Sequence, residues 1–399
     1  MSRTPLTTSL VSRGAGGIAA LTVAGSVLLA GCATGNGSVS STSSTSSLPP
    51  LPPTVTALVA LAGSGNNLGY GSAVVPVAIS GGVGAGPKVG RRIRVGTFPD
   101  AIAVNPAGTM AYVANYSSND VTPIDLATDR AGPSIPAGIG PAGIAISPDG
   151  KTAYVTDDGS SSTLGDTVTP INLTTDKPGR PIRVGSGPQG IVITPDGSMA
   201  YVADAGAIVT GQSGPIGDTV TPINLASGKA EAPIKVGNGP TGMAITPDGS
   251  TVFVTNLNSG SVSPISTAAN TAGFPITVKG GPVAVAVAKG DAWVVDTPSS
   301  SYSGSNVTPI SINTDRAGSP IAVPKGAQAI AVTPSGKQVW VACLDSNLIV
   351  SIDLRARRAG RRIAIGGGPF ALAIVQQSQG NTAPSTPPTT THKKKKKSS

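Results

Sequence analysis

Residues 140–157 read GPAGIAISPDGKTAYVTD, and close copies recur at 187–204 (GPQGIVITPDGSMAYVAD) and 239–256 (GPTGMAITPDGSTVFVTN). A second phrase, VTPI or a variant of it, accompanies every copy and begins at Val74, Val121, Val168, Val220, Val262, Val307 and Ile349. Neighbouring copies of this phrase are 42 to 52 residues apart. A recurring unit of this length indicates a repeat architecture, here with seven copies.

Each repeat contains four short apolar segments, which we name strands A to D. In one copy they are residues 144–146, 153–156, 167–173 and 181–184, rich in Val, Ile, Thr and Tyr and bounded by Gly, Pro and Asp. This composition is typical of β-strands. The A–B connection is Pro-Asp-Gly at 148–150, 195–197 and 247–249, where Pro presets φ and Gly supplies a positive φ. A four-stranded unit repeated around an axis predicts propeller blades.

A proline recurs within strand C, where it removes one hydrogen-bond donor from the ladder and predicts a local bulge. The prolines are Pro123, Pro170, Pro222, Pro264 and Pro309.

The two ends of the chain predict how the ring closes. A strand B (residues 56–60) precedes Val74 without a strand A before it, and the missing strand A appears at 368–375 as GPFALAIV. A C-terminal strand A that joins the N-terminal strands B to D would remove free sheet edges at the seam. We therefore expect an all-β fold, a seven-bladed β-propeller over residues 54–379.

The ends of strand B carry a further pattern, YVAN at 112–115, YVTD at 154–157, YVAD at 201–204 and FVTN at 253–256. These segments resemble YVTN-type β-propeller repeats over roughly residues 56–375, with departures at WVVD (293–296) and WVAC (340–343). The resemblance implies a secreted or surface-exposed propeller. It implies little about activity, because this fold hosts unrelated functions.

The N-terminal residues predict export and lipidation. Arg3 and Arg13 precede an apolar stretch at 17–30, and Leu29-Ala30-Gly31-Cys32 matches a bacterial lipoprotein cleavage box. Residues 1–31 are thus a predicted signal peptide and Cys32 the acylated residue, anchored to the membrane outside the cytoplasm. A plain transmembrane anchor is the alternative, although the stretch is short for a span. Residues 32–53, rich in Ser, Thr and Pro, are a predicted tether.

The net charge of +9 is carried largely by the two ends. Without Arg3, Arg13 and the tail lysines, 21 basic face 19 acidic residues, and a ring so nearly neutral predicts no nucleic-acid partner. Residues 380–399 form a predicted Pro/Thr-rich linker that ends in a poly-Lys tail. The tail is either a solvated end or a contact for anionic envelope polymers or lipid head groups, through Lys393, Lys394, Lys395, Lys396 and Lys397.

The sequence lacks the residues that several kinds of catalytic site require. The only histidine, His392, lies in the tail, and Glu231 is the only glutamate. This excludes His-dependent triads and His-ligated metals in the ring, as well as paired-Glu glycosidase sites. Cys343 is the only cysteine besides Cys32 and is expected to be a structural residue. We predict no catalytic residue, metal or cofactor, and a monomeric ring.

Asn and Asp recur at the ends of strand B. The residues are Asn115, Asp157, Asp204, Asn256 and Asp296. Two interpretations remain open: their side chains hold the following turn through local hydrogen bonds, or several of them coordinate a cation across the ring.

The B–C connections differ in length, and this is the best pointer to a site. Plain blades have five residues (116–120 and 257–261), whereas three have ten (158–167), fifteen (205–219) and ten (297–306). These connections should share one face of the ring, where recognition is usually located, although tolerated surface insertions are the alternative. The candidate binding residues are Asp157, Asp158, Asp166, Asp204, Gln212, Asp218, Asp296, Tyr302 and Asn306.

Together these features predict a non-catalytic, membrane-anchored extracytoplasmic propeller that recognises an envelope polymer or protein partner through its long B–C loops. The alternative is a propeller enzyme of the lyase or lactonase type that uses Asp residues around the central channel.

Overall fold

The computed structural model describes residues 54–63, 71–80, 86–160, 162–208, 214–297 and 305–377. In these ranges the secondary structure consists of strands, turns and bends. Among the described residues no helix is long and apolar enough to cross a membrane. The predicted signal peptide, tether, Cys32 and poly-Lys tail, with Gln212 and Tyr302, lie outside the described residues.

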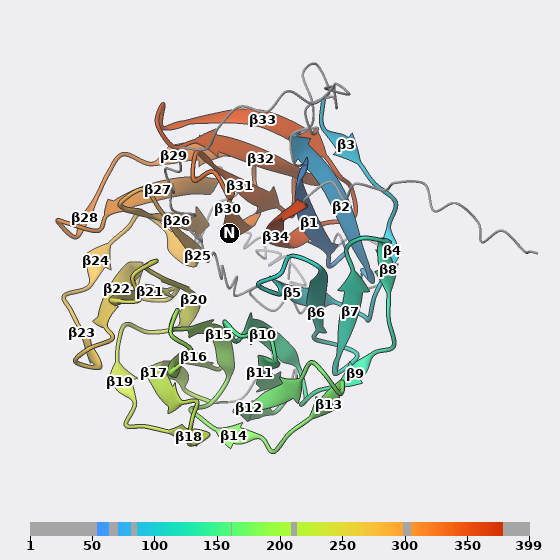
Figure 1. The fold of residues 1–399 in the computed structure, drawn as a ribbon. Coiled ribbons are helices and arrows are strands. Elements are labelled where there is room, and N and C mark those ends of the chain that lie inside the picture. The colour runs from blue at the N-terminus through green and yellow to red at the C-terminus, as the bar shows by residue number, and fades with distance from the viewer. Residues whose placement is uncertain are drawn as a thin grey trace, which may run out of the picture.

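The described residues form seven antiparallel sheets arranged in a ring, which confirms the predicted seven-bladed propeller (Figure 1). We number the blades along the chain. Blade 1 contains β34 (Pro369–Gln377), β1 (Thr54–Leu61), β2 (Ala73–Ser80), β3 (Lys88–Val89) and β4 (Ile93–Arg94). Blade 2 contains β5 (Pro99–Val104), β6 (Met110–Asn115), β7 (Asp120–Asp125), β8 (Arg130–Ala131) and β9 (Ile135–Pro136).

The next three blades follow the same order. Blade 3 contains β10 (Pro141–Ile146), β11 (Thr152–Gly159), β12 (Leu164–Asn172), β13 (Lys177–Pro178) and β14 (Ile182–Arg183). Blade 4 contains β15 (Pro188–Ile193), β16 (Met199–Gly206), β17 (Ile216–Asn224), β18 (Lys229–Ala230) and β19 (Ile234–Lys235). Blade 5 contains β20 (Pro240–Ile245), β21 (Thr251–Asn256), β22 (Ser261–Ser266), β23 (Thr271–Ala272) and β24 (Ile276–Thr277).

The last two blades complete the ring. Blade 6 contains β25 (Gly281–Ala288), β26 (Asp291–Thr297), β27 (Ser305–Ser311), β28 (Arg316–Ala317) and β29 (Ile321–Val323). Blade 7 contains β30 (Ala327–Val332), β31 (Gln338–Cys343), β32 (Leu348–Asp353) and β33 (Arg358–Ala364). We call the face with the B–C connections the upper face and the face with the A–B turns the lower face.

The predicted seam is confirmed by the pairing of the two ends of the chain. β1 pairs with β34 from Thr54 opposite Gln377 to Leu61 opposite Pro369, and blue β1 lies beside red β34 in Figure 1. The innermost strands of neighbouring blades contact each other all round the ring, including β34 with β5 and β30 with β34. Both described chain ends therefore leave blade 1 at its lower face, since Leu61 marks its upper end.

Seven hydrophobic clusters hold the ring together, one at each contact between neighbouring blades. The seam has two of them: Phe370 packs toward blade 2, and Leu372 packs toward blade 7. Burying a large apolar side chain stabilises a fold by roughly 1.5–3 kcal/mol. Each blade is thus held by its two neighbours.

The sequence predicts a local bulge at the strand C proline, and the structure has its irregularity on the side of strand D: strand D is interrupted opposite the proline, while the B–C register runs through it unbroken. In blade 2 the carbonyl of Pro123 accepts a hydrogen bond from the backbone N–H of Gly132 (2.8 Å), between β8 and β9. Blade 7 has Ser351 at this position, whose hydroxyl accepts a bond from the N–H of Arg361 (2.9 Å), and its strand D, β33, is continuous. The expected four strands per blade therefore hold for blade 7, while strand D of the other six is divided in two.

Candidate functional site: a raised wall on the upper face

Blades 3 and 4 rise above their neighbours on the upper face. In blades 2 and 5 the B–C ladder ends at Asn115 opposite Asp120 and at Asn256 opposite Ser261. In blade 3 pairing continues past Asp157 to Gly159 opposite Leu164, and in blade 4 past Asp204 to Gly206 opposite Ile216. The two adjacent extensions are ordered hairpins, which we call the wall (residues 157–167 and 204–219, as far as they are described).

The connections between blades fasten the wall to the ring. The backbone of 184–187 bonds on one side to Gly165 and Asp166 of blade 3, and on the other to Ala205 and Gly206 of blade 4. These four hydrogen bonds are 2.8–3.0 Å long. Residues 137–140 make the corresponding bonds to Asp158 and Gly159. Because each connection ties two blades, the wall is part of the ladder network and not a loop attached at two points.

Glycines permit this close backbone packing. A Cβ on Gly165 would lie 1.9 Å from the carbonyl oxygen of Asp157, and one on Gly217 would lie 2.0 Å from that of Asp204. No side chain fits at such distances. The wall therefore needs glycine at equivalent positions of its two hairpins, which sequence reasoning did not single out.

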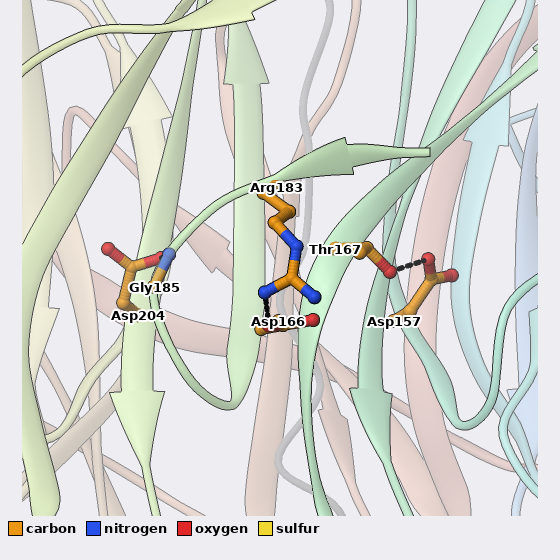
Figure 2. Close-up of polar contacts among 6 residues, drawn as sticks. All are labelled: Asp157, Asp166, Thr167, Arg183, Gly185 and Asp204. Atoms are coloured by element: carbon orange, nitrogen blue, oxygen red, sulfur yellow. Dashed lines mark hydrogen bonds and ion pairs between the residues drawn. The ribbon is translucent and has the colours of Figure 1, made fainter. Parts of the chain in front are cut away.

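An ion pair braces the base of each hairpin. Asp166 on β12 accepts a 2.6 Å bond from Arg183 on β14, as Figure 2 shows. Asp218 on β17 pairs in the same way with Lys235 on β19. The cationic side chains are largely exposed, so each pair is worth at most about 1 kcal/mol. The structure thus places the predicted site residues Asp166 and Asp218 on the outer side of the wall.

The Asp residues at the ends of strand B lie inside the blades. Asp157 Oδ2 accepts bonds from the hydroxyls of Thr167 (2.7 Å) and Thr169 (2.8 Å) on strand C, and its Oδ1 from the N–H of Gly138 (3.1 Å). Asp204 repeats this arrangement with Thr219, Thr221 and Gly185, and Figure 2 shows Asp204 beside Gly185. Asp296 accepts a 2.5 Å bond from Thr308. These carboxylates tie strand B to strand C and are not exposed for binding.

Burial raises the pKa of these carboxyls. It raises the pKa of Asp157 and of Asp204 to about 6, against the opposing effect of their Thr hydroxyl and Gly N–H donors. It raises the pKa of Asp296 to about 7, since only Thr308 opposes it. In blades 3, 4 and 6 the contact between the end of strand B and strand C is therefore sensitive to pH.

Blades 2 and 5 have Asn at the same position, and the hydrogen bonds reverse. Asn115 Nδ2 donates to Asp120 Oδ1 (2.7 Å) and to Thr122 Oγ1 (2.9 Å), and Asn256 Nδ2 donates to Ser261 and Ser263. Among the described residues, the end of strand B is Asp in blades 3, 4 and 6, which have enlarged B–C connections, and Asn in blades 2 and 5, which have short ones. The geometry favours local hydrogen bonding over cation coordination, and the described residues contain no group of three or more His, Cys, Asp or Glu able to hold a metal.

A second acidic feature lies at the upper ends of blades 2 and 3. Asp100, the second residue of β5, is fully buried, and neither carboxylate oxygen has a hydrogen-bond partner among the described residues. Burial first, and then the charge of Asp158, raise its pKa well above the usual value. Asp158 is fully buried too, and burial, followed by the charges of Asp158 and Asp100, raises the pKa of Tyr116. Sequence reasoning missed Asp100 because strands A otherwise carry Ala, Gln, Thr, Val or Phe there.

Two large apolar side chains are exposed on or beside the wall. Ile139 and Ile216 are 61% and 45% exposed. Ile216 belongs to the hairpin of blade 4, whereas Ile139 lies in the connection before blade 3, where its carbonyl accepts a bond from Gly159 of the blade 3 hairpin (2.9 Å). Phe274, 93% exposed, lies alone on the outer edge of blade 5.

The remaining predicted residues are placed differently or not described. In the third enlarged connection Asn306 is half-buried and pairs with Asp296 in the ladder, and Tyr302 is not described. A further long connection, residues 62–72 of blade 1, escaped the sequence analysis because the repeat is split there. Cys343 is fully buried, and burial raises its pKa to about 12, which fits a structural role.

No family model and no curated protein matches the chain. Among solved structures, it is similar to hydrazine synthase from Kuenenia stuttgartiensis, with 19% identity over 70% of this chain and 96% of that chain, at a TM-score of 0.58. It is also similar to a functionally unknown protein from Desulfotomaculum acetoxidans, with 14% identity over 81% of this chain and 99% of that chain, at a TM-score of 0.64. At these identities the likeness shows the propeller fold alone.

Proposed function

We propose that this chain is a non-catalytic, lipid-anchored extracytoplasmic propeller that binds an envelope polymer or protein partner through the wall. The observation that carries the proposal is the wall itself, ordered backbone raised over two adjacent blades and braced to the ring, with Ile216 exposed on it and Ile139 exposed beside it. An ordered surface loses little conformational freedom on binding, which favours affinity. The cleavage box at Cys32 and the resemblance to YVTN-type repeats support a location outside the cytoplasm.

The positions of the chain ends support this arrangement. Cys32 precedes Thr54 by 22 residues, and Thr54 starts at the lower face, opposite the wall. An anchor at Cys32 would therefore be attached through the tether to the lower face, on the opposite side of the ring from the wall.

A loop graft tests the proposal. In the graft, residues 205–219 are replaced by the five-residue connection 257–261 of blade 5, which joins equivalent strand ends. We expect the graft to fold and to lose capture of the partner from an envelope fraction. A matched control replaces 116–120 with 257–261, one plain connection with another, and should capture as the parent does. Undiminished capture by the wall graft would refute the assignment.

The enzyme alternative, of the lyase or lactonase type, now has a more specific pair of residues. Asp157 and Asp204 are engaged with strand C, whereas Asp100 and Asp158 are the buried carboxylates that influence each other. This alternative predicts that Asp100→Asn, at a residue outside the wall, abolishes turnover of an envelope substrate while capture by the wall is unchanged. The binding proposal predicts no turnover to abolish.

A further inference from the structure

The charge of the ring is unevenly distributed. Nine of its 21 basic residues lie in two segments, 88–94 and 355–362, which contain no Asp or Glu. The rest of the ring has twelve basic and nineteen acidic residues, a net charge of −7. The near-neutral total of the propeller therefore hides a strongly basic region and an acidic remainder.

The two basic segments meet at the seam. Residues 88–94 form β3 and β4, the outer strands of blade 1, and 355–362 form the turn into β33 and most of that outer strand in blade 7. In Figure 1 β3 lies near one end of β33, whereas β4 lies beside β8 of blade 2. All nine side chains are exposed. We call this surface the basic edge, consisting of Lys88, Arg91, Arg92, Arg94, Arg355, Arg357, Arg358, Arg361 and Arg362.

Most of this charge is not neutralised within the ring. Arg357 pairs with Asp291 (2.9 Å) and lies over the ring of Trp293. In the part of the chain that the structure describes, no ion pair holds the other eight. Holding like charges together costs free energy, which an anionic partner offsets.

A pocket on this edge is lined by two guanidinium groups and by one carboxylate, that of Asp353. It has a volume of about 340 Å³ and lies between blade 7 and Ile79 of blade 1. Arg358 and Arg361 line it together with Trp340, whose buried indole N–H has no hydrogen-bond partner among the described residues. Guanidinium groups bind phosphate oxygens through paired N–H donors.

The basic edge runs along the height of the seam blades. Lys88 lies opposite Ala78 and Arg358 opposite Asp353, at the lower ends of their blades, whereas Arg94 lies opposite Ala73, at the upper end of blade 1. The described ends, Thr54 and Gln377, pair at the lower end of blade 1, so the lower part of the basic edge lies on the same side of the ring as the chain ends.

We propose that the basic edge binds the head groups of anionic phospholipids. This binding does not depend on the proposed anchor at Cys32. Each Lys or Arg at an anionic surface contributes several-fold to binding, and salt screens the effect.

The test compares binding of the full chain to vesicles of phosphatidylcholine with and without phosphatidylglycerol. The apolar N-terminal segment should bind both vesicles alike, so the ratio of the two isolates the electrostatic contribution. We expect a preference for anionic vesicles that falls at high salt, and at least about tenfold less preference in the triple variant R358Q/R361Q/R362Q. The matched control K151Q/K177Q/R180Q removes the same charge from exposed sites of blade 3 and should keep the preference.

Three outcomes would overturn the proposal. The first is an unchanged preference in the blade 7 triple variant. The second is a preference lost only when Lys393 to Lys397 are replaced by Gln, which would assign the binding to the tail. The third is a triple variant that loses binding to inorganic polyphosphate but retains its vesicle preference, which would assign the edge to a soluble polyanion. The wall graft should leave the vesicle preference intact, so failure of the proposed function would be distinguishable.

Discussion

The wall blades, 3 and 4, and the seam blades, 7 and 1, are built on the same four-strand unit and depart from it in different ways. The wall blades add backbone: their B and C strands run past Asp157 and Asp204 into ordered hairpins. The seam blades add charge at their outer strands and combine the two ends of the chain in one sheet. In a repeat protein the shared four-strand unit explains the fold, and the blades that differ from this unit indicate where function is located.

The two regions differ even at one equivalent position. The end of strand B is Asp157 or Asp204 in the wall blades, and Cys343 or Leu61 in the seam blades. Burial raises the pKa of the wall carboxyls to about 6, whereas the Cys343 thiol, whose pKa burial raises to about 12, stays protonated in this range. Of these two regions, the wall blades should therefore be the pH-sensitive one at this position, as blade 6 should also be through Asp296.

Truncation of the chain at Gly367 should have the largest effect on stability, because it removes a whole strand from the seam and leaves the sequence of the wall intact. A chain that ends at Gly367 lacks β34, and with it buried Phe370, Leu372 and Val375. At roughly 1.5–3 kcal/mol for each large apolar side chain, the loss approaches the whole stability of a typical domain. We expect this chain not to fold cooperatively, as measured by thermal unfolding followed by circular dichroism.

Two controls belong to this experiment. Removal of residues 380–399 should leave the melting temperature nearly unchanged, and so should the wall graft, which keeps every blade closed. A Gly367 truncation as stable as the full chain would mean that β34 does not close the ring.

Asp204→Asn should change stability by an intermediate amount. Because the folded-state pKa is raised, the stability contributed by protonated Asp204 is present below the unfolded value near 4 and is lost as pH rises through about 6. Asn fits the site, as Asn115 does in blade 2, and it has no charge to bury. We expect the variant to be more stable at pH 8, by up to roughly 3 kcal/mol, with a flatter stability profile between about pH 4 and 6.

Urea unfolding at several pH values measures this effect, and Asp149→Asn, on an exposed turn, is the control. A steeper pH dependence in Asp204→Asn than in the parent would contradict the burial of a carboxylate at this position.

Asp166→Asn should have the smallest effect. Its partner Arg183 is largely exposed, so the ion pair contributes at most about 1 kcal/mol. We expect a melting temperature within about 2 °C of the parent. A larger loss would show that the ion pairs, and not the backbone ladder with its glycines, hold the wall in place.

The periodicity of the sequence was sufficient to predict the number of blades and the way the ring closes. The spacing of the VTPI phrase reflects the strand C that every blade contains, and the proline in it corresponds to the divided strand D of the blades that carry it. The missing strand A corresponds to the closure of blade 1 by β34. Side-chain direction was harder to predict. Asp157, Asp204 and Asp296 stand at the mouths of long connections in the sequence, yet hydrogen bonds to strand C turn their carboxylates into the blade.

Two features could not be predicted from the sequence because each is formed by residues that lie far apart in the chain. The basic edge joins residues 88–94 with 355–362, which only the closed seam brings together, and the total charge conceals it. The acidic pair joins Asp100 and Asp158, which lie on neighbouring blades. Neither follows from a local motif, since each depends on how one blade packs against the next.

Site-specific photo-cross-linking in living cells tests the central claim most directly. A photoreactive residue replaces Ile216 on the wall in one variant, and in the other it replaces Phe274, the more exposed but isolated apolar residue of blade 5. The account predicts a discrete cross-linked species from position 216 and none from position 274. The same species from both positions, or from 274 alone, would contradict the claim that the wall is where this propeller meets its partner.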